Sequence, residues 1–151
     1  MAEVFRQILD GDDIPTPDGM LKIKQTDVSV ELQGFPYSII TNLAHAVLWQ
    51  DIWLNSLHGG PRESMIEKWK NDWRVPPQSE WPSLRKEFVD GLKEAHRIAG
   101  SIPMDHKMET DEAAINLLVC IAVHSSYHMG QLNLLKRSIR QYNSDLKKSK
   151  L

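Results

Sequence analysis

Two histidines in the last third of the sequence, His124 and His128, stand four positions apart. On a helix, side chains at this spacing lie on one face with Cβ atoms about 5–6 Å apart, so two imidazoles can converge on one metal ion. Hydrogen-bonded histidines without a metal are the commoner explanation of such a pair. The apolar pattern, however, places both on a buried face, where bare imidazoles lose water and a metal ion removes that cost.

A third ligand is expected from another helix, and His45 is the candidate because it lies on the apolar face of a predicted helix. Cys120 precedes His124 by four positions, but successive steps of four drift around a helix axis, so Cys120 is expected to be a small core residue. The other histidines are predicted to lie outside the ligand set: His58 and His106 exposed, and His96 at most beside the ligands. The sequence therefore predicts a divalent-metal site of His45, His124 and His128.

Three neutral imidazoles leave the charge of a divalent ion uncompensated and at least one coordination position open, which is typical of a catalytic site. Such an ion can deliver hydroxide or thiolate to an electrophile, because it lowers the pKa of bound water and deprotonates a bound thiol. Asn42 and Gln131, each three positions from a predicted ligand, could orient the ligands or equally bond helix to helix. Trp49 is predicted as core, with a pocket wall as the alternative.

The three predicted metal ligands lie in segments whose apolar residues recur with helical periodicity. Three helices are predicted: about Asp111 to Tyr142, Ser38 to about His58, and near Ser79 to Ala99. Thr110 and Ser38 are the expected N-caps, and Gly59-Gly60-Pro61 and Gly100 are stop signals. Gly130 inside the longest helix is expected to permit close helix approach, because glycine there costs roughly 1 kcal/mol.

The N-terminal third carries weaker signals. Thr16-Pro17 is typical of a helix start and Gly34-Phe35-Pro36 of an end, which predicts a helix over about 17 to 33. Val28-Ser29-Val30 would suit a strand equally well. A short helix over about Ala2 to Leu9 is predicted before it.

The connection from Gly59 to Gln78 is long for a turn between antiparallel helices. It is predicted either to cross over, so that the flanking helices run parallel, or to cover one end of the bundle where a site could lie. The sequence assigns no catalytic acid or base, since Asp51 and Glu63 are expected to be solvated.

Length and composition favour one domain over residues 1–151 with a net charge of -2. No block of like charge precedes the tail, so no nucleic-acid partner is expected. The single cysteine fits a reducing compartment, and no uninterrupted run of 18 apolar residues or signal-peptide pattern is present. A soluble, cytoplasmic protein without a membrane partner is therefore expected.

Two segments resemble the signatures of the DinB/YfiT-like family of metalloenzymes. The first is His124-Ser-Ser-Tyr-His128-Met-Gly130-Gln131-Leu132, and the second is Tyr37-Ser38-Ile39-Ile40-Thr41-Asn42-Leu43-Ala44-His45, continuing through Trp49-Gln50. Phe5-Arg6-Gln7-Ile8-Leu9-Asp10-Gly11 is similar to the start of one branch. The resemblance covers most of the chain, in order.

The resemblance implies an all-α four-helix bundle with an up-down-down-up arrangement, a three-histidine site usually holding zinc or nickel, and a homodimer. The family includes thiol S-transferases and a mycothiol-dependent isomerase. The leading hypothesis is therefore a metal-dependent transferase that activates a low-molecular-weight thiol toward an electrophile. The alternatives are a metal-dependent hydrolase using metal-bound hydroxide, and a non-catalytic, stress-associated metal-binding dimer.

Overall fold

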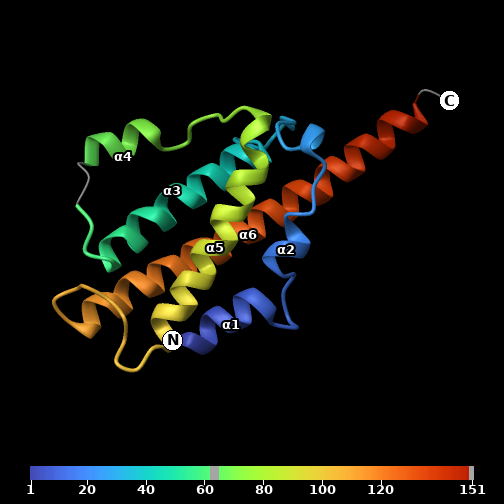
Figure 1. The fold of residues 1–151 in the computed structure, drawn as a ribbon. Helices are drawn as coiled ribbons and strands as arrows, with labels where there is room; N and C mark the ends of the chain where they lie inside the picture. The colour runs from blue at the N-terminus through green and yellow to red at the C-terminus, as the bar shows by residue number, and fades with distance from the viewer. Residues whose placement is uncertain (62–64, 150–151) are drawn as a thin grey trace.

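The structure, a computed structural model, describes residues 1–61 and 65–149 (Figure 1). Over these residues the chain is all-helical and forms no strand, which confirms the predicted all-α class. The α-helices are α1 (Ala2–Asp10), α2 (Pro17–Met20), α3 (Ile39–Leu57), α4 (Met65–Asn71), α5 (Trp81–Gly100) and α6 (Asp111–Lys148), with two 3-10 helices, η1 (Gln25–Asp27) and η2 (Gln78–Glu80).

The two helices that carry the predicted ligands begin at the predicted caps. Ser38 Oγ accepts a hydrogen bond from the backbone N–H of Thr41 at the start of α3, and Thr110 Oγ1 accepts one from Ala113 at the start of α6. α3 ends just before Gly59, whose φ of 74° is readily adopted only by glycine. The predicted bounds of α3 and α5 are confirmed, whereas α6 continues past the expected end to Lys148.

The long helices pack side by side. α3 contacts both α5 and α6, and α1 contacts α5 and α6. In Figure 1, α3 and α5 both run from upper right to lower left, while α6 runs in the opposite direction and its C-terminal turns project beyond the other helices. The connection through α4 and η2 therefore returns the chain to the end of the molecule at which α3 begins.

The core lies between these helices and contains fully buried side chains from α1, α3, α5 and α6, among them Phe5, Leu43, Phe88 and Leu118. α5 approaches α3 closely at Gly91. A Cβ atom there would lie 2.1 Å from Oε1 of the buried Gln50, so only glycine fits this crossing without a shift.

The predicted helix over about 17 to 33 is wrong beyond its first turn. Thr16 caps α2 as expected, accepting a hydrogen bond from the backbone N–H of Gly19, but α2 ends at Met20. Residues 28–30 form no strand either. The segment is held by single buried side chains, Leu21 and Val28, rather than by helical periodicity. The short predicted helix near the N-terminus is confirmed as α1, which extends to Asp10.

One window of α6 is long and apolar enough to span a membrane by length and composition, with a mean hydropathy of 1.2. Within the chain, 39% of that window is buried. Core helices of soluble proteins meet the same criterion, and α6 packs against α1, α3 and α5. The finding is therefore weak evidence for a membrane span.

Candidate metal centre

The three predicted ligands come together between α3 and α6. His124 Nε2 lies 3.2 Å from His45 Nε2 and 3.1 Å from His128 Nε2. In a tetrahedral zinc site with Zn–N bonds of about 2.0–2.1 Å, two ligand nitrogens lie about 3.3–3.4 Å apart. Both measured separations are close to this value, and one nitrogen from each of the three imidazoles lies within 4.8 Å of the others, so the cluster could hold a metal ion.

The cluster is largely removed from water. His45 and His128 are 8% and 1% exposed, whereas His124 lies at the edge of the buried stripe of α6 and is half-buried. Burial, together with the charge that His45 would carry, lowers the pKa of His124 to about 4. Burial and the two neighbouring histidines lower the pKa of His128 to about 3. Both rings are therefore neutral at pH 7, which is the form that binds metal ions.

Hydrogen bonds at the far side of two rings fix where their protons lie. His45 Nδ1–H donates to the carboxylate of Asp72, which can only accept. His128 Nδ1–H donates to Asn42 Oδ1 at 2.7 Å, and Asn42 Nδ2 donates to Gln131 Oε1 at 3.0 Å. The Nε2 atoms of both histidines consequently present lone pairs to the centre of the cluster. Asn42 and Gln131 were predicted either to orient the ligands or to bond helix to helix. Their hydrogen bond joins α3 to α6, and Asn42 also holds His128.

The ring of His124 is also placed in a way that suits a bound cation. Its Nδ1 atom is buried and has no hydrogen-bond partner among the described residues, while its Nε2 atom faces both other rings. Trp53 meets the ring edge to face at a centroid distance of 5.1 Å. Facing lone pairs in a buried site are unfavourable without a proton or a cation between them. The donor set is therefore suited to a divalent ion that prefers imidazole.

Asp72 and Trp73 belong to the site although sequence reasoning did not find them. Asp72 Oδ1 accepts hydrogen bonds from His45, from Trp49 Nε1 at 3.3 Å and from the backbone N–H of Trp73 at 3.1 Å. The Trp73 ring stacks on His45 at 3.7 Å and on Tyr37 at 3.9 Å. Trp73 also has a φ of 55°, a backbone conformation that costs energy outside glycine and often marks functional sites.

The signal that could have found them is the length of the Gly59 to Gln78 connection, which was predicted to cross over or to cover a site. The segment after α4 does reach the cluster through Asp72 and Trp73. Trp49, predicted as core or pocket wall, is half-buried and donates a hydrogen bond to the carboxylate of Asp72. The polar and aromatic surroundings of His45 therefore come from both α3 and this connection.

The remaining candidates lie outside the cluster. Cys120 is exposed, so its prediction as a core residue is wrong, because it faces away from the buried stripe of α6. His58 is exposed as expected. His106 was expected to be exposed, yet its side chain is 7% exposed because it bonds to Asp111 and to the backbone N–H of Met108. Glu63 lies outside the described residues.

Comparison of the chain with protein-family models, with curated proteins and with solved structures finds no match. The resemblance to the DinB/YfiT-like family therefore stays a prediction that rests on the sequence segments quoted above. What the chain does has to be inferred from its own residues and their geometry.

Proposed function

We propose that this protein is a divalent-metal-dependent enzyme of the DinB/YfiT-like type, a transferase that activates a low-molecular-weight thiol at His45, His124 and His128. Zinc and nickel are the metals that the resemblance implies. The observation that carries the proposal is the convergence of three imidazole Nε2 atoms, 3.1–3.2 Å apart along the cluster, in a buried position. Three imidazoles with no carboxylate ligand favour an open, catalytic site over a structural one.

When bound, the ion would supply Lewis acidity, which converts a coordinated thiol to thiolate near neutral pH. The chain's own residues would hold the ligands in place. Asp72 fixes the ring of His45, and Asn42 fixes that of His128 through the hydrogen bonds at Nδ1. Ligand rings held in this way keep Nε2 aimed at the ion and become more basic.

A pocket beside Trp73 offers space for an electrophilic substrate. It has a volume of about 600 Å³ and is lined by residues that include Tyr37, Thr41 and Trp73. This volume lies in the range typical of small-molecule sites, and the aromatic rings of Tyr37 and Trp73 give it an apolar wall. Trp73 also stacks on His45, so this residue connects the pocket to the cluster, although no cluster histidine lines the pocket itself.

The function is tested by loading the purified protein with zinc or nickel and supplying an electrophilic aryl halide with a panel of small thiols. We expect loss of the electrophile that depends on thiol, protein and metal together. His128→Ala should lower the rate at least about 100-fold, because the ion is no longer held. His106→Ala, which changes a histidine outside the cluster, is the matched control. The reaction is followed by absorbance of the thioether product.

Two other results would replace the proposal. Hydrolysis of esters or amides that needs the metal but no thiol would make the protein a hydrolase using metal-bound hydroxide. Stoichiometric metal without turnover of either substrate class would make it a non-catalytic metal-binding protein.

We further infer that α1, α3, α5 and α6 form a four-helix bundle in an up-down-down-up arrangement. The contacts of α3 with α5 and α6, and of α1 with α5 and α6, support this inference. So do the shared direction of α3 and α5 and the opposite direction of α6 in Figure 1. α1, the short helix predicted near the N-terminus, would then be the first helix of the bundle.

A homodimer through α6 is the assembly that we propose. Val119, Val123, Tyr127 and Leu134 are exposed apolar residues at spacings of four and seven, so they form a stripe on one face of this helix. Gly130 lies on the same face, and a Cβ added there would meet nothing within 4 Å. Gly130 was expected to permit close helix approach, yet no helix among the described residues packs against it. A second copy of α6 could pack there.

Val123→Arg is expected to convert this dimer to a monomer, because the charge would be buried at the centre of the interface. Val123 is 65% exposed within one chain, so the folded monomer can accommodate the arginine. Ile66→Arg, at a residue of α4 that is 66% exposed, is the matched control and should stay dimeric. Sedimentation velocity measures the oligomeric state of the wild type and of both variants. A wild-type monomer, or a dimer that Val123→Arg leaves intact, would contradict the proposed interface.

A further inference from the structure

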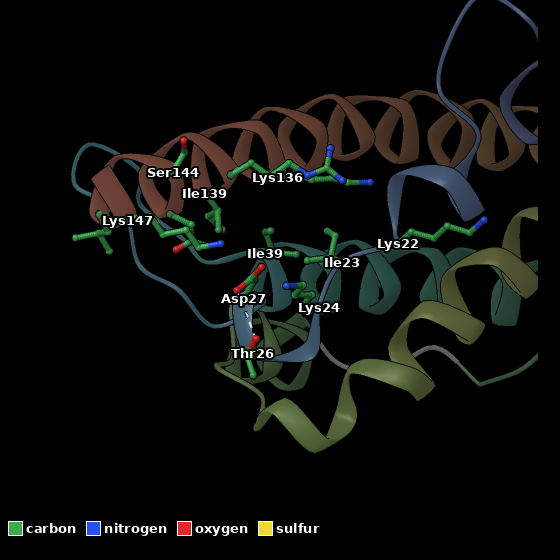
Figure 2. Close-up of a pocket in the computed structure, with 13 residues that line it drawn as sticks. Lys22, Ile23, Lys24, Thr26, Asp27, Ile39, Lys136, Ile139, Ser144 and Lys147 are labelled. Carbon is green, nitrogen blue, oxygen red and sulfur yellow. Dashed lines mark hydrogen bonds between the residues drawn. The ribbon is translucent and has the colours of Figure 1, made fainter. Parts of the chain in front are cut away.

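A second pocket lies between the C-terminal half of α6 and the segment that joins α2 to η1 (Figure 2). Its volume is about 600 Å³. Figure 2 shows Ile139 on α6 facing Ile23 and Ile39 on the opposite wall. No residue of the histidine cluster lines it, and Lys136 on its wall is eight residues beyond His128, about 12 Å along the helix. The pocket is therefore distinct from the candidate metal centre.

The walls of this pocket are strongly cationic. Among the described residues that line it, the basic ones are Lys22, Lys24, Lys136, Arg140 and Lys147, and the one acidic residue is Asp27. Within residues 1–61 and 65–149, none of the five cations lies within ion-pair distance of a carboxylate. The whole chain carries a net charge of -2, so this concentration of positive charge is local.

Lys136 is fixed at the wall of this pocket, where the charges of two other basic residues act on it. Its ammonium group donates hydrogen bonds to the backbone carbonyls of Gly19 and Met20, both at 2.9 Å, which holds it at the pocket wall. Burial, followed by the charges of Arg140 and Lys22, lowers its pKa. Like charges held together in this way repel, and a bound anion would relieve the repulsion.

The pocket is also apolar at its base. Ile23, which is half-buried, and Leu146, which is 40% exposed, provide accessible apolar surface there, while Ile39 and Ile139 are lining residues that are almost completely buried. A simple inorganic anion would be held by the cations but would leave this surface in contact with water. A ligand that fits both features needs a compact negative charge joined to an apolar body.

We propose that this pocket binds a small molecule in which a phosphate group is attached to an apolar body. Five cations against one carboxylate favour a doubly charged phosphate over a singly charged carboxylate. The cations line a hollow with a volume typical of small-molecule sites, rather than a flat face, and this favours a small ligand over a polyanion. The inference is independent of the metal centre and goes beyond the proposed function.

Isothermal titration calorimetry with phenyl phosphate and with inorganic phosphate, at low salt, tests the proposal on the 151-residue chain. We expect phenyl phosphate to bind at least about tenfold more tightly than inorganic phosphate, since only the ester covers the apolar base. Arg140→Gln should lower the affinity for phenyl phosphate at least about tenfold, because a charge-assisted hydrogen bond is lost. Arg137→Gln, an exposed arginine on α6 that does not line the pocket, is the matched control and should change nothing.

Equal affinity for the two phosphates, or the same affinity in wild type and Arg140→Gln, would overturn the proposal. A lipid headgroup could present the same chemistry, so a second arm uses vesicles of phosphatidylcholine and phosphatidic acid in equal parts. We expect no cosedimentation with them. Cosedimentation that Arg140→Gln abolishes and Arg137→Gln does not would overturn the assignment to a soluble ligand.

Discussion

After purification with zinc or nickel and removal of loosely bound ions, the wild-type protein is expected to retain about one metal ion per chain. His45→Ala, His124→Ala and His128→Ala should each retain little or none. Each substitution leaves two imidazoles where the cluster offers three, and the remaining ligands do not compensate. Elemental analysis by mass spectrometry measures the stoichiometry. His106→Ala is the matched control, because this side chain is also buried but lies outside the cluster.

A thermal shift gives an independent measurement on the same samples. An ion that binds only the folded chain stabilises it by about 2.7 kcal/mol when its free concentration is 100 times the dissociation constant. For a chain of this size, that corresponds to a rise in melting temperature of roughly 5–10 °C. Wild type and His106→Ala should show the rise, and His128→Ala should not. Wild type that holds no metal, or the same metal content in all variants, would rule out the centre.

Asp72→Ala is expected to weaken metal binding by about 10- to 100-fold, although Asp72 is not among the ligating histidines. The carboxylate holds the Nδ1 proton of His45 and so keeps Nε2 free for the ion. Asp72→Asn should weaken binding less, because an amide oxygen can still accept that proton. Competition with a chromophoric chelator measures the affinity. Asp51→Asn, on α3 and exposed, is the control.

A double substitution separates positioning of His45 from a general loss of structure. His45→Ala leaves only the weak metal binding of two imidazoles, and if Asp72 acts through His45, replacing Asp72 as well should not weaken that binding further. Additive losses in the double variant, or full affinity in Asp72→Ala, would show that the contact is incidental.

The starts of both helices that carry the predicted ligands, and the end of α3, could be predicted because nearby residues encode them. Ser38 and Thr110 cap the first turns of α3 and α6 through their own side chains, and Gly59 follows the end of α3. The spacing of His124 and His128 then places both rings on one side of α6. Pairing them with His45 required only that these two helices pack together.

The parts that could not be predicted lie in segments where no periodic pattern applies. Asp72 reaches His45 from an irregular segment 27 positions away, where no periodicity indicates which way a side chain points. Thr16 correctly marks the start of α2, but a cap does not determine where a helix ends. His106 is buried by its bonds to nearby groups, although its position in a connecting segment favoured exposure. Asp72 thus depends on a contact distant in sequence, whereas the bonds of His106 are local ones that residue type and periodicity do not reveal.

The order of the ligands along the chain has a consequence for how the centre would acquire its ion. His45 precedes His124 by 79 positions, and α6 supplies two of the three ligands. During synthesis His45 therefore leaves the ribosome long before its partners, and α3 alone offers only one imidazole. Metal insertion would follow the docking of α6 on α3, so a metal-loaded chain would report that the last described helix has folded into place.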